Sequence, residues 1–317
     1  MSIGFVFPGQ GSQQVGMGRG LAETSATARE VFDEVDEALG QKLSTLMWEG
    51  PEDDLTLTEN AQPALMAVSL AVVRVLMADH GIAITTAAFV AGHSLGEYSA
   101  LAAAETFRLA DTARLLKLRG QAMQRATPVG TGAMAALIGL DYEAAAMVAR
   151  DAAAGEICQP ANDNAPGQVV VSGHRSAVER AIELAKSRGA RRALLLSVSA
   201  PFHCTLMQPA AEVMAEALQA VEMKPPIVPL VANVTAGPLK DPAAIRANLV
   251  RQVTDTVRWR ECVSFMAGGG VSLFAELGSG KVLTGLVRRI APDAAAVAAG
   301  TPEEIAALAG RISASGG

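Results

Sequence analysis

Aromatic, cysteine, histidine and charged residues are all scarce in this chain of 317 residues. Phe, Trp and Tyr make up 4% of it, so the core must be built from Ala, Val and Leu, in line with the 50% share of hydrophobic residues. Only 18% of the residues are charged and the net charge is −6. No cluster of Lys and Arg stands out, which argues against a nucleic-acid partner. The composition therefore indicates a folded globular protein.

Disulfide and membrane signals are also missing. The three cysteines, Cys158, Cys204 and Cys262, are widely separated and form no C-x-x-C pair. This odd, sparse count predicts a reducing compartment and no disulfide framework. The first residues lack the basic and long apolar segments of a signal peptide, and the longest apolar stretch, at residues 63–73, is too short to span a bilayer. We expect a cytoplasmic protein with no membrane segment.

The chain also lacks the usual signatures of metal and nucleotide sites. It has four histidines, and no two of them pair on one helix face, so no metal site is expected. The Gly-Gln-Gly loop at residues 9–11 lacks the third glycine of G-x-G-x-x-G, since Gln14 stands in its place. The Gly-Ser-Gly-Lys segment at residues 278–281 likewise fails the pattern of a Walker A phosphate loop, and we interpret it as a tight turn into a helix.

A serine in the pattern G-x-S-x-G is the most informative feature that is present: Gly92-His93-Ser94-Leu95-Gly96. The apolar run at residues 87–91 predicts a short buried strand before it, and the Ala-rich stretch at 97–104 predicts a helix after it. This is the context of a nucleophile elbow, a turn so tight that only small residues fit around a serine placed at a helix N-terminus. An N-capping serine after a turn glycine gives the same pattern, but the flanking strand and helix favour the nucleophile.

Strands and helices alternate over most of the chain, which predicts a mainly parallel sheet covered on both faces. Strands are predicted at residues 3–7, 87–91, 228–232 and 271–275, and long helices at 24–39, 62–80 and 109–125. Turn residues at 127–132 mark a boundary. We therefore predict an α/β fold whose larger domain comprises residues 1–126 and 200–317, with the last five residues frayed.

Between the two parts of this domain, the order of predicted elements is β-α-β-β-α-β, as in a ferredoxin-like unit. The strands are predicted at residues 133–139, 157–161, 168–172 and 192–198, the helices at 142–153 and 176–187, and a turn at 162–167. Residues 127–199 are therefore predicted to form an inserted ferredoxin-like α+β subdomain.

A serine nucleophile needs a base, and one of the four histidines suits this role best. His80 ends a helix, where it compensates the helix dipole; His174 lies in a predicted surface turn; and His93 would diverge from Ser94 at a tight turn and pack against neighbouring loops. His203 follows the insert directly, at a junction of domains where clefts form. We predict a Ser94–His203 dyad, since no downstream acid has a distinctive setting.

Two further features suggest where the protein could meet negative charge. Arg119 lies on the apolar face of the helix at 109–125, where an unpaired charge is costly. Either a protein carboxylate such as Glu97 or a substrate carboxylate must meet it, and the pattern alone leaves both open. The glycine loop at 9–11 can present a backbone N–H to an oxyanion, with the N–H of Leu95 as the second donor.

Taken together, these segments resemble the malonyl-CoA:acyl carrier protein transacylases, acyltransferases of fatty acid and polyketide synthesis. The matching motifs follow the family's order over nearly the whole chain: FPGQGSQ at 7–13, GHSLGEY at 92–98, LRG at 118–120, ANDNAPGQ at 161–168, FH at 202–203, VRQ at 250–252 and ELGSGKVL at 276–283. The resemblance implies a hydrolase-like α/β domain with a ferredoxin-like insert.

The resemblance also implies roles at the matching positions. Ser94 would be the acylated nucleophile and His203 its base, and Arg119 would bind the malonyl carboxylate. The backbone N–H groups of Gln10 and Leu95 would form the oxyanion hole.

Three more positions take their expected roles from the resemblance alone. Gln252 would hold the imidazole through its carbonyl, and Asn162 and Phe202 would bind substrate. In this family, Phe before the base tends to accompany malonyl rather than methylmalonyl substrates, whereas many fatty-acid members have Ser there.

The implied reaction is ping-pong transfer of malonyl from malonyl-CoA to the phosphopantetheine thiol of acyl carrier protein, by a monomer with no permanently bound cofactor. One alternative is a serine thioesterase or esterase, against which the cation on an apolar face argues. The other is a non-catalytic subunit that docks carrier protein, which the set Ser94, His203 and Arg119 disfavours.

Overall fold

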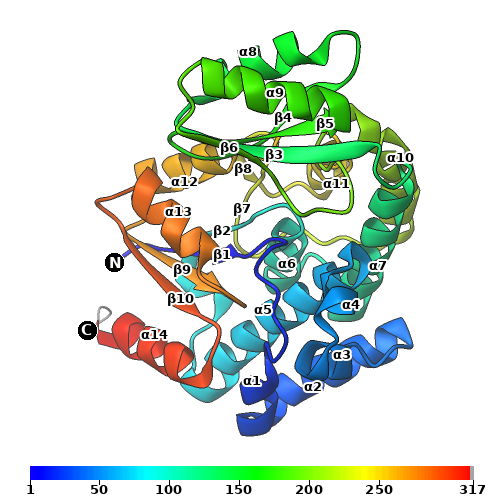
Figure 1. Cartoon of the computed structure of the whole chain (residues 1–317). Helices are drawn as coiled ribbons and strands as arrows, with labels where there is room; N and C mark the ends of the chain where they lie inside the picture. The colour runs from blue at the N-terminus through cyan, green and yellow to red at the C-terminus, as the bar shows by residue number, and fades with distance from the viewer. Residues whose placement is uncertain (315–317) are drawn as a thin grey trace.

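Two β-sheets organise the chain, whose computed structural model describes residues 1–314 (Figure 1). The larger sheet has six strands in the order β10-β9-β1-β2-β7-β8, and the smaller has four in the order β4-β5-β3-β6. The strands of the larger sheet are β1 (Ile3–Phe7), β2 (Ala87–Gly92), β7 (Leu230–Val231), β8 (Pro238–Leu239), β9 (Leu273–Leu277) and β10 (Ala295–Ala299).

The larger sheet is parallel except at one edge. β1 pairs in parallel with β2 and β9, β10 joins β9 and β7 joins β2 in parallel, and β8 alone pairs antiparallel, with β7. All five residues of β1 are buried, as expected for a strand covered on both faces. Phe5 and Phe7 belong to one hydrophobic core and Val6 to another, so successive side chains point to opposite faces. The prediction of a mainly parallel, doubly covered sheet is confirmed.

Helices contribute residues to both of these cores. The core of Phe5 contains residues of α2 (Ala26–Leu39), α5 (Thr58–His80), α6 (Gly96–Ala103), α7 (Leu109–Arg125) and α10 (Gln208–Ala220). The core of Val6 contains residues of α12 (Trp259–Gly268) and α13 (Val282–Ile290). The remaining helices of this part are α1 (Arg19–Thr24), α3 (Leu43–Glu49), α4 (Glu52–Thr56), α11 (Pro242–Gln252) and α14 (Pro302–Ala314).

Helix α5 is the one helix within residues 1–314 that is long and apolar enough to cross a membrane by length and composition. Its most apolar window is 78% buried inside the molecule. That burial is typical of a core helix, and α5 packs against α2 and α7.

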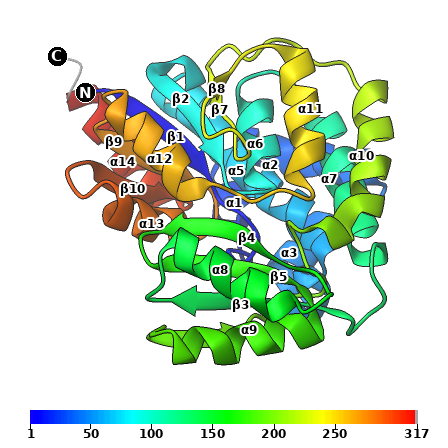
Figure 2. The same ribbon diagram turned by 90° about the horizontal axis from the view of Figure 1, so that it is seen from above.

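The smaller sheet is antiparallel throughout and lies above the larger one in Figure 1. Its elements follow the order β3 (Gly132–Ile138), α8 (Tyr142–Ala153), β4 (Cys158–Ala165), β5 (Gln168–His174), α9 (Arg175–Ser187) and β6 (Arg192–Leu195). Both helices cover the face turned away from the larger sheet, as the view from above shows (Figure 2). This order and pairing confirm the ferredoxin-like α+β unit. The unit falls inside residues 127–199, whereas the division into two domains stays a prediction.

The structure corrects the prediction of a turn at 162–167. Asn162 to Ala165 continue β4, and only Pro166 and Gly167 form the turn. Asn and Asp favour turns in isolation, but here they pair with Val170 and Val169 of β5. Tertiary pairing therefore overrides the local preference.

Other boundaries differ by a few residues. The strand predicted at 228–232 is reduced to Leu230–Val231, the one at 271–275 lies at Leu273–Leu277, and the one at 192–198 ends at Leu195. Residues 313–314, predicted to fray, end α14, and the rest of that predicted segment lies outside the described residues.

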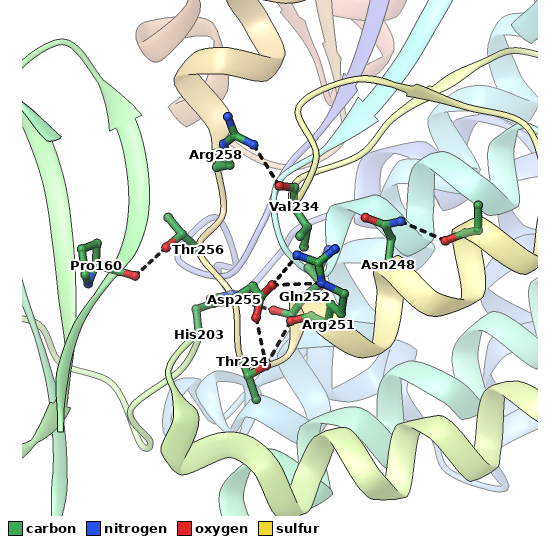
Figure 3. Close-up of polar contacts among 11 residues, drawn as sticks. Pro160, His203, Val234, Asn248, Arg251, Gln252, Thr254, Asp255, Thr256 and Arg258 are labelled. Atoms are coloured by element: carbon green, nitrogen blue, oxygen red, sulfur yellow. Dashed lines mark hydrogen bonds and ion pairs between the residues drawn. The ribbon is translucent and has the colours of Figure 1, made fainter. Parts of the chain in front are cut away.

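A connecting segment at residues 253–258, between α11 and α12, ties the two sheets together. The backbone N–H of Val257 donates to the Ala161 carbonyl at 2.9 Å, and that of Asp163 donates to the Val257 carbonyl at 2.9 Å. The Thr256 hydroxyl donates to the Pro160 carbonyl at 2.7 Å (Figure 3). The edge of β4 is thus bonded to the main chain of the larger part of the molecule.

Candidate active site

The serine of the G-x-S-x-G motif lies in a sharp turn between β2 and α6. Ser94 has φ of 53°, in the left-handed region that L-residues rarely adopt. A Cβ on Gly92 would lie 1.9 Å from the backbone of Gly96, and one on Gly96 would lie 2.3 Å from the Phe7 carbonyl oxygen. Neither position has room for a side chain, so the two glycines permit the strained turn that presents the serine. The prediction of a strand–turn–helix context is confirmed.

Asn233, which no sequence motif marks, holds this turn from the loop after β7. Its Oδ1 accepts from the backbone N–H of Ser94 at 2.8 Å, and its Nδ2 donates to the Gly92 carbonyl at 2.7 Å. Its own backbone N–H donates to Glu97 Oε2 at 2.8 Å. Both sides of the nucleophile are therefore held by one fully buried amide.

Ser94 and His203 meet directly, 109 residues apart in the sequence. The Ser94 Oγ lies 2.8 Å from His203 Nε2. His203 Nδ1 lies 2.7 Å from the backbone carbonyl of Gln252, at the end of α11; Figure 3 labels His203 and Gln252. A carbonyl can only accept, so Nδ1 carries the proton and Nε2 offers its lone pair to the serine. Within residues 1–314 no carboxylate contacts this imidazole, and a backbone oxygen takes the orienting place.

The environment of His203 keeps its ring neutral. Burial and, second to it, the positive charge of Arg119 lower the pKa of His203 to about 3. The hydrogen bond to the Gln252 carbonyl acts in the opposite direction and raises this pKa. A neutral imidazole is the form that accepts a proton. At neutral pH the ring is therefore in its proton-accepting form.

Arg119 points its guanidinium at the same serine. Its Nη1 donates to Gln62 Oε1 at 2.8 Å, and its Nη2 donates to Gln252 Oε1 at 3.0 Å and to Ser94 Oγ at 3.2 Å. Its Nε–H finds no acceptor within residues 1–314. The side chain is only 1% exposed, and burial lowers its pKa, while Tyr98 and Glu97 oppose that shift.

Of the two partners that the sequence left open for Arg119, a protein carboxylate such as Glu97 or a substrate carboxylate, the structure does not show the first among its described residues. The Glu97 carboxylate forms no ion pair with the guanidinium, and neither does any other carboxylate within residues 1–314. Its Oε2 instead accepts from Asn233 and from Gln252 Nε2. The protein surrounds its buried cation with neutral amides, a hydroxyl and the ring of Tyr98, whose centroid lies 5.7 Å from the guanidinium carbon.

Gln10 and Leu95, the predicted oxyanion donors, both line the cleft beside Ser94. Neither backbone N–H donates a hydrogen bond within the described part of the chain. The Gln10 side chain is held by the Thr58 hydroxyl at 3.3 Å. Leu95 is the N-cap of α6 and Gln10 lies in the loop after β1. Two backbone donors, one of them at a helix N-terminus, suit the stabilisation of a developing oxyanion.

The cleft in front of the serine has a volume of about 360 Å³ and lies between the loops of the larger sheet and the inner face of the smaller one. Apolar side chains from α7, β3, β5 and the segment after β6 line much of it: Met123, Met134, Val170, Leu196 and Val198. Asn162 and Phe202 line it too, and their roles in substrate binding stay predictions.

The other histidines are structural in this arrangement. His93 Nε2 lies 2.8 Å from Asn164 Oδ1, and its ring meets that of Trp259 edge-on. His174 ends β5 and accepts from the Ile157 N–H at 2.9 Å, so it is not in the predicted surface turn. His80 lies in the last turn of α5, as predicted. No cluster of His, Cys, Asp or Glu that could hold a metal ion occurs within residues 1–314.

A strained serine with a neutral histidine base and two backbone donors beside it defines a serine acyl-transfer site. Comparison with known proteins shows the family to which the chain belongs. The acyl transferase domain family matches residues 4–311, and the chain belongs to that family.

Its relatives within the family carry a more specific name. Malonyl CoA-acyl carrier protein transacylases of Bacillus subtilis and Escherichia coli are 46% and 47% identical to it, covering 96% of this chain and 95% and 97% of theirs. An acyl-carrier-protein S-malonyltransferase of Bartonella henselae matches in structure with a TM-score of 0.96 and 56% identity, covering 99% of this chain and all of its own. A malonyl-transacylase solved in complex with a type II PKS acyl-carrier protein matches with a TM-score of 0.95 and 43% identity, over 98% of this chain and 100% of its own.

Proposed function

We propose that the protein transfers malonyl from malonyl-CoA to the phosphopantetheine thiol of an acyl carrier protein, by way of a malonyl ester on Ser94. The observation that carries this proposal is the Arg119 guanidinium, which is buried, has no carboxylate partner within residues 1–314 and lies 3.2 Å from the Ser94 hydroxyl. An esterase of simple acyl groups gains nothing from a buried cation there, whereas an acyl group that ends in a carboxylate pairs with it.

The first half of the reaction acylates the serine. His203 Nε2 takes the hydroxyl proton while Ser94 Oγ attacks the thioester carbon, and the carbonyl electron pair moves onto the oxygen. The N–H groups of Gln10 and Leu95 stabilise this oxyanion, each by about 3 kcal/mol in the transition state. When the intermediate collapses, the C–S bond breaks, the proton passes from His203 to the leaving sulfur, and coenzyme A departs.

The second half reverses these steps with a different thiol. His203 takes the proton of the phosphopantetheine thiol, the sulfur attacks the ester carbonyl, and the C–O bond to Ser94 breaks as the hydroxyl regains its proton. Water competes for the ester. The carboxylate held by Arg119 and the apolar lining of the cleft favour the positioned thiol over water.

Several further assignments belong to the same proposal. The two pantetheine thioesters are substrates, and no permanently bound cofactor takes part. The protein acts as a monomer in the cytoplasm, away from membranes, and its product serves fatty acid synthesis. Cys158, Cys204 and Cys262 are free and buried, which suits a reducing compartment.

Intact-mass measurement after incubation with a panel of acyl-CoAs tests the proposal. Malonyl-CoA should add one malonyl group, Ser94→Ala should abolish the shift, and holo-carrier protein should discharge it. Ser99→Ala, at a buried serine of α6, the helix that follows Ser94, serves as the matched control and should retain the label. A shift that persists in Ser94→Ala, or release of free malonate faster than transfer, would refute the proposal.

A further inference from the structure

A buried carboxylate that takes no part in the chemistry lies behind the active site. Glu97, in the first turn of α6, is 1% exposed, and its Oε2 accepts from the Asn233 N–H at 2.8 Å and from Gln252 Nε2 at 3.0 Å. Its Oε1 has no hydrogen-bond partner within residues 1–314. Burying a carboxylate is costly, so a group retained here calls for a function.

Gln252 connects this carboxylate to the guanidinium. Its Nε2 donates to Glu97 Oε2 and to the Ser94 carbonyl, both at 3.0 Å, with Asn233 Oδ1 at 3.3 Å. Its Oε1 accepts from Arg119 Nη2 at 3.0 Å. The side-chain amide therefore spans from the carboxylate on one side to the cation on the other.

The surroundings allow one orientation of that amide. If the side-chain amide of Gln252 were flipped, so that Oε1 and Nε2 exchanged places, its oxygen would face three acceptors and its NH₂ group would face the guanidinium donors. Of those acceptors, Glu97 is the one that is able to carry a full charge, and charge-assisted hydrogen bonds are about twice as strong as neutral ones. Glu97 thus contributes most to keeping the Gln252 oxygen directed at Arg119.

We propose that Glu97 is a positioning residue that acts through the Gln252 amide to hold the Arg119 guanidinium in line with Ser94. This inference rests on the proposed function, because a held guanidinium matters for a substrate with a carboxylate and not for one without. Without Glu97, the substrate would have to order Arg119 as it binds, and the cost would appear as weaker binding of malonyl-CoA alone.

Kinetics of self-acylation with malonyl-CoA and acetyl-CoA separate this role from general damage to the fold. In Glu97→Ala the malonyl-to-acetyl ratio of kcat/KM should fall by about tenfold, through a higher KM for malonyl-CoA, as expected for the loss of one charge-assisted interaction. Glu97→Gln, which keeps an acceptor, should lie between wild type and Glu97→Ala. Asp36→Asn, at a buried carboxylate of α2 that accepts from the backbone N–H and the hydroxyl of Ser44 in α3, should leave the ratio unchanged.

A double-mutant cycle checks the route through Gln252. Gln252→Ala removes the side-chain amide but keeps the backbone carbonyl that accepts from His203. In that background Glu97→Ala should lower the ratio no further, since the connecting group is gone. A further drop equal to the one in the wild-type background would overturn the inference.

A pH series gives a readout that a purely structural role would not move. Burial raises the pKa of Glu97 to about 7, against the hydrogen bonds from Asn233 and Gln252 and the charge of Arg119. The titratable neighbours Tyr98 and Cys262 have pKa values raised by burial, and so they stay neutral around pH 7. The ratios of wild type and Glu97→Gln should therefore converge below about pH 7, where Glu97 is protonated, and diverge above it.

Failure of this inference is distinguishable from failure of the proposed function. If wild type forms malonyl-Ser94 and Arg119→Ala loses malonyl preference, but Glu97→Ala keeps the wild-type ratio, then the positioning role alone is wrong. If wild type never acquires malonyl on Ser94, the proposed function is wrong and the inference falls with it.

Discussion

Replacement of Arg119 by alanine tests most directly whether the buried guanidinium recognises the acyl group. The side chain is 1% exposed, so solvent screens its interactions little. Two hydrogen bonds between a guanidinium and a carboxylate, each contributing about 1.5–3 kcal/mol, correspond to roughly 10²- to 10⁴-fold in rate. Nη2 already donates to Gln252 and Ser94, so only part of the hydrogen-bonding capacity of the guanidinium is open to the substrate. We therefore expect the lower end, a loss of about a hundredfold in kcat/KM for malonyl-CoA.

Acetyl-CoA provides the internal comparison. Its methyl group cannot pair with the guanidinium, so Arg119→Ala should change its kcat/KM by less than about threefold. The assay is formation of acyl-Ser94 followed by mass spectrometry over time with each thioester. Arg119→Met, which keeps most of the side-chain volume, controls for a cavity, and Arg114→Ala, at an exposed position of the same helix, controls for surface charge. Equal losses for malonyl and acetyl in Arg119→Met would refute the reasoning.

Three other predictions follow from the geometry of the turn and its base. Since burial and the nearby guanidinium hold the pKa of His203 at about 3, kcat/KM for acetyl-CoA should stay flat as the pH falls from about 6.5 to about 5, and a tenfold fall per pH unit there would contradict a neutral, buried base. Gly92→Ala, whose Cβ would lie 1.9 Å from backbone atoms, should lower the free energy of unfolding by about 3 kcal/mol or more. Gly285→Ala, in α13 with open space around it, should raise the free energy of unfolding by about 0.5–1 kcal/mol. Denaturant midpoints measure both changes, and similar effects at the two sites would contradict the packing argument. Asn233→Ala should slow acylation of Ser94 by malonyl-CoA and acetyl-CoA alike, by about tenfold, because the turn loses both of its braces; a change in the malonyl-to-acetyl ratio would show that this amide acts on substrate recognition instead.

Much of the site was predictable because its main residues have strong local signatures. Ser94 lies in a motif whose glycines are required sterically, and Arg119 interrupts an apolar helix face, so both stand out from their neighbours. His203 stands out by elimination among the four histidines and by its position after the insert. The structure brings His203 and Arg119 within hydrogen-bonding distance of the Ser94 hydroxyl.

The residues that support Ser94, Arg119 and His203 have no such signature in the sequence. Asn233 lies 139 residues from Ser94 and is flanked by apolar residues, so nothing in its neighbourhood indicates a contact with the turn. Gln62 lies on a helix that is buried nearly all round, where a single amide is easily taken for a packing residue. The run at 162–165 shows the converse error, since its turn-forming residues were decisive locally but are held in β4 by partners on β5 and at Val257. These contacts join segments far apart in the chain, and only the folded arrangement reveals them.

The segment at 253–258 has a consequence for how substrates reach Ser94. Its backbone continues the hydrogen-bond ladder of β4, and the residue before it supplies the oxygen that steadies the His203 ring. Moving the smaller sheet away from the larger part of the molecule would break these hydrogen bonds and disturb the general base at the same time. Substrates that reach Ser94 with these hydrogen bonds intact must enter through the existing cleft, which suits the slender pantetheine arm common to the proposed donor and acceptor.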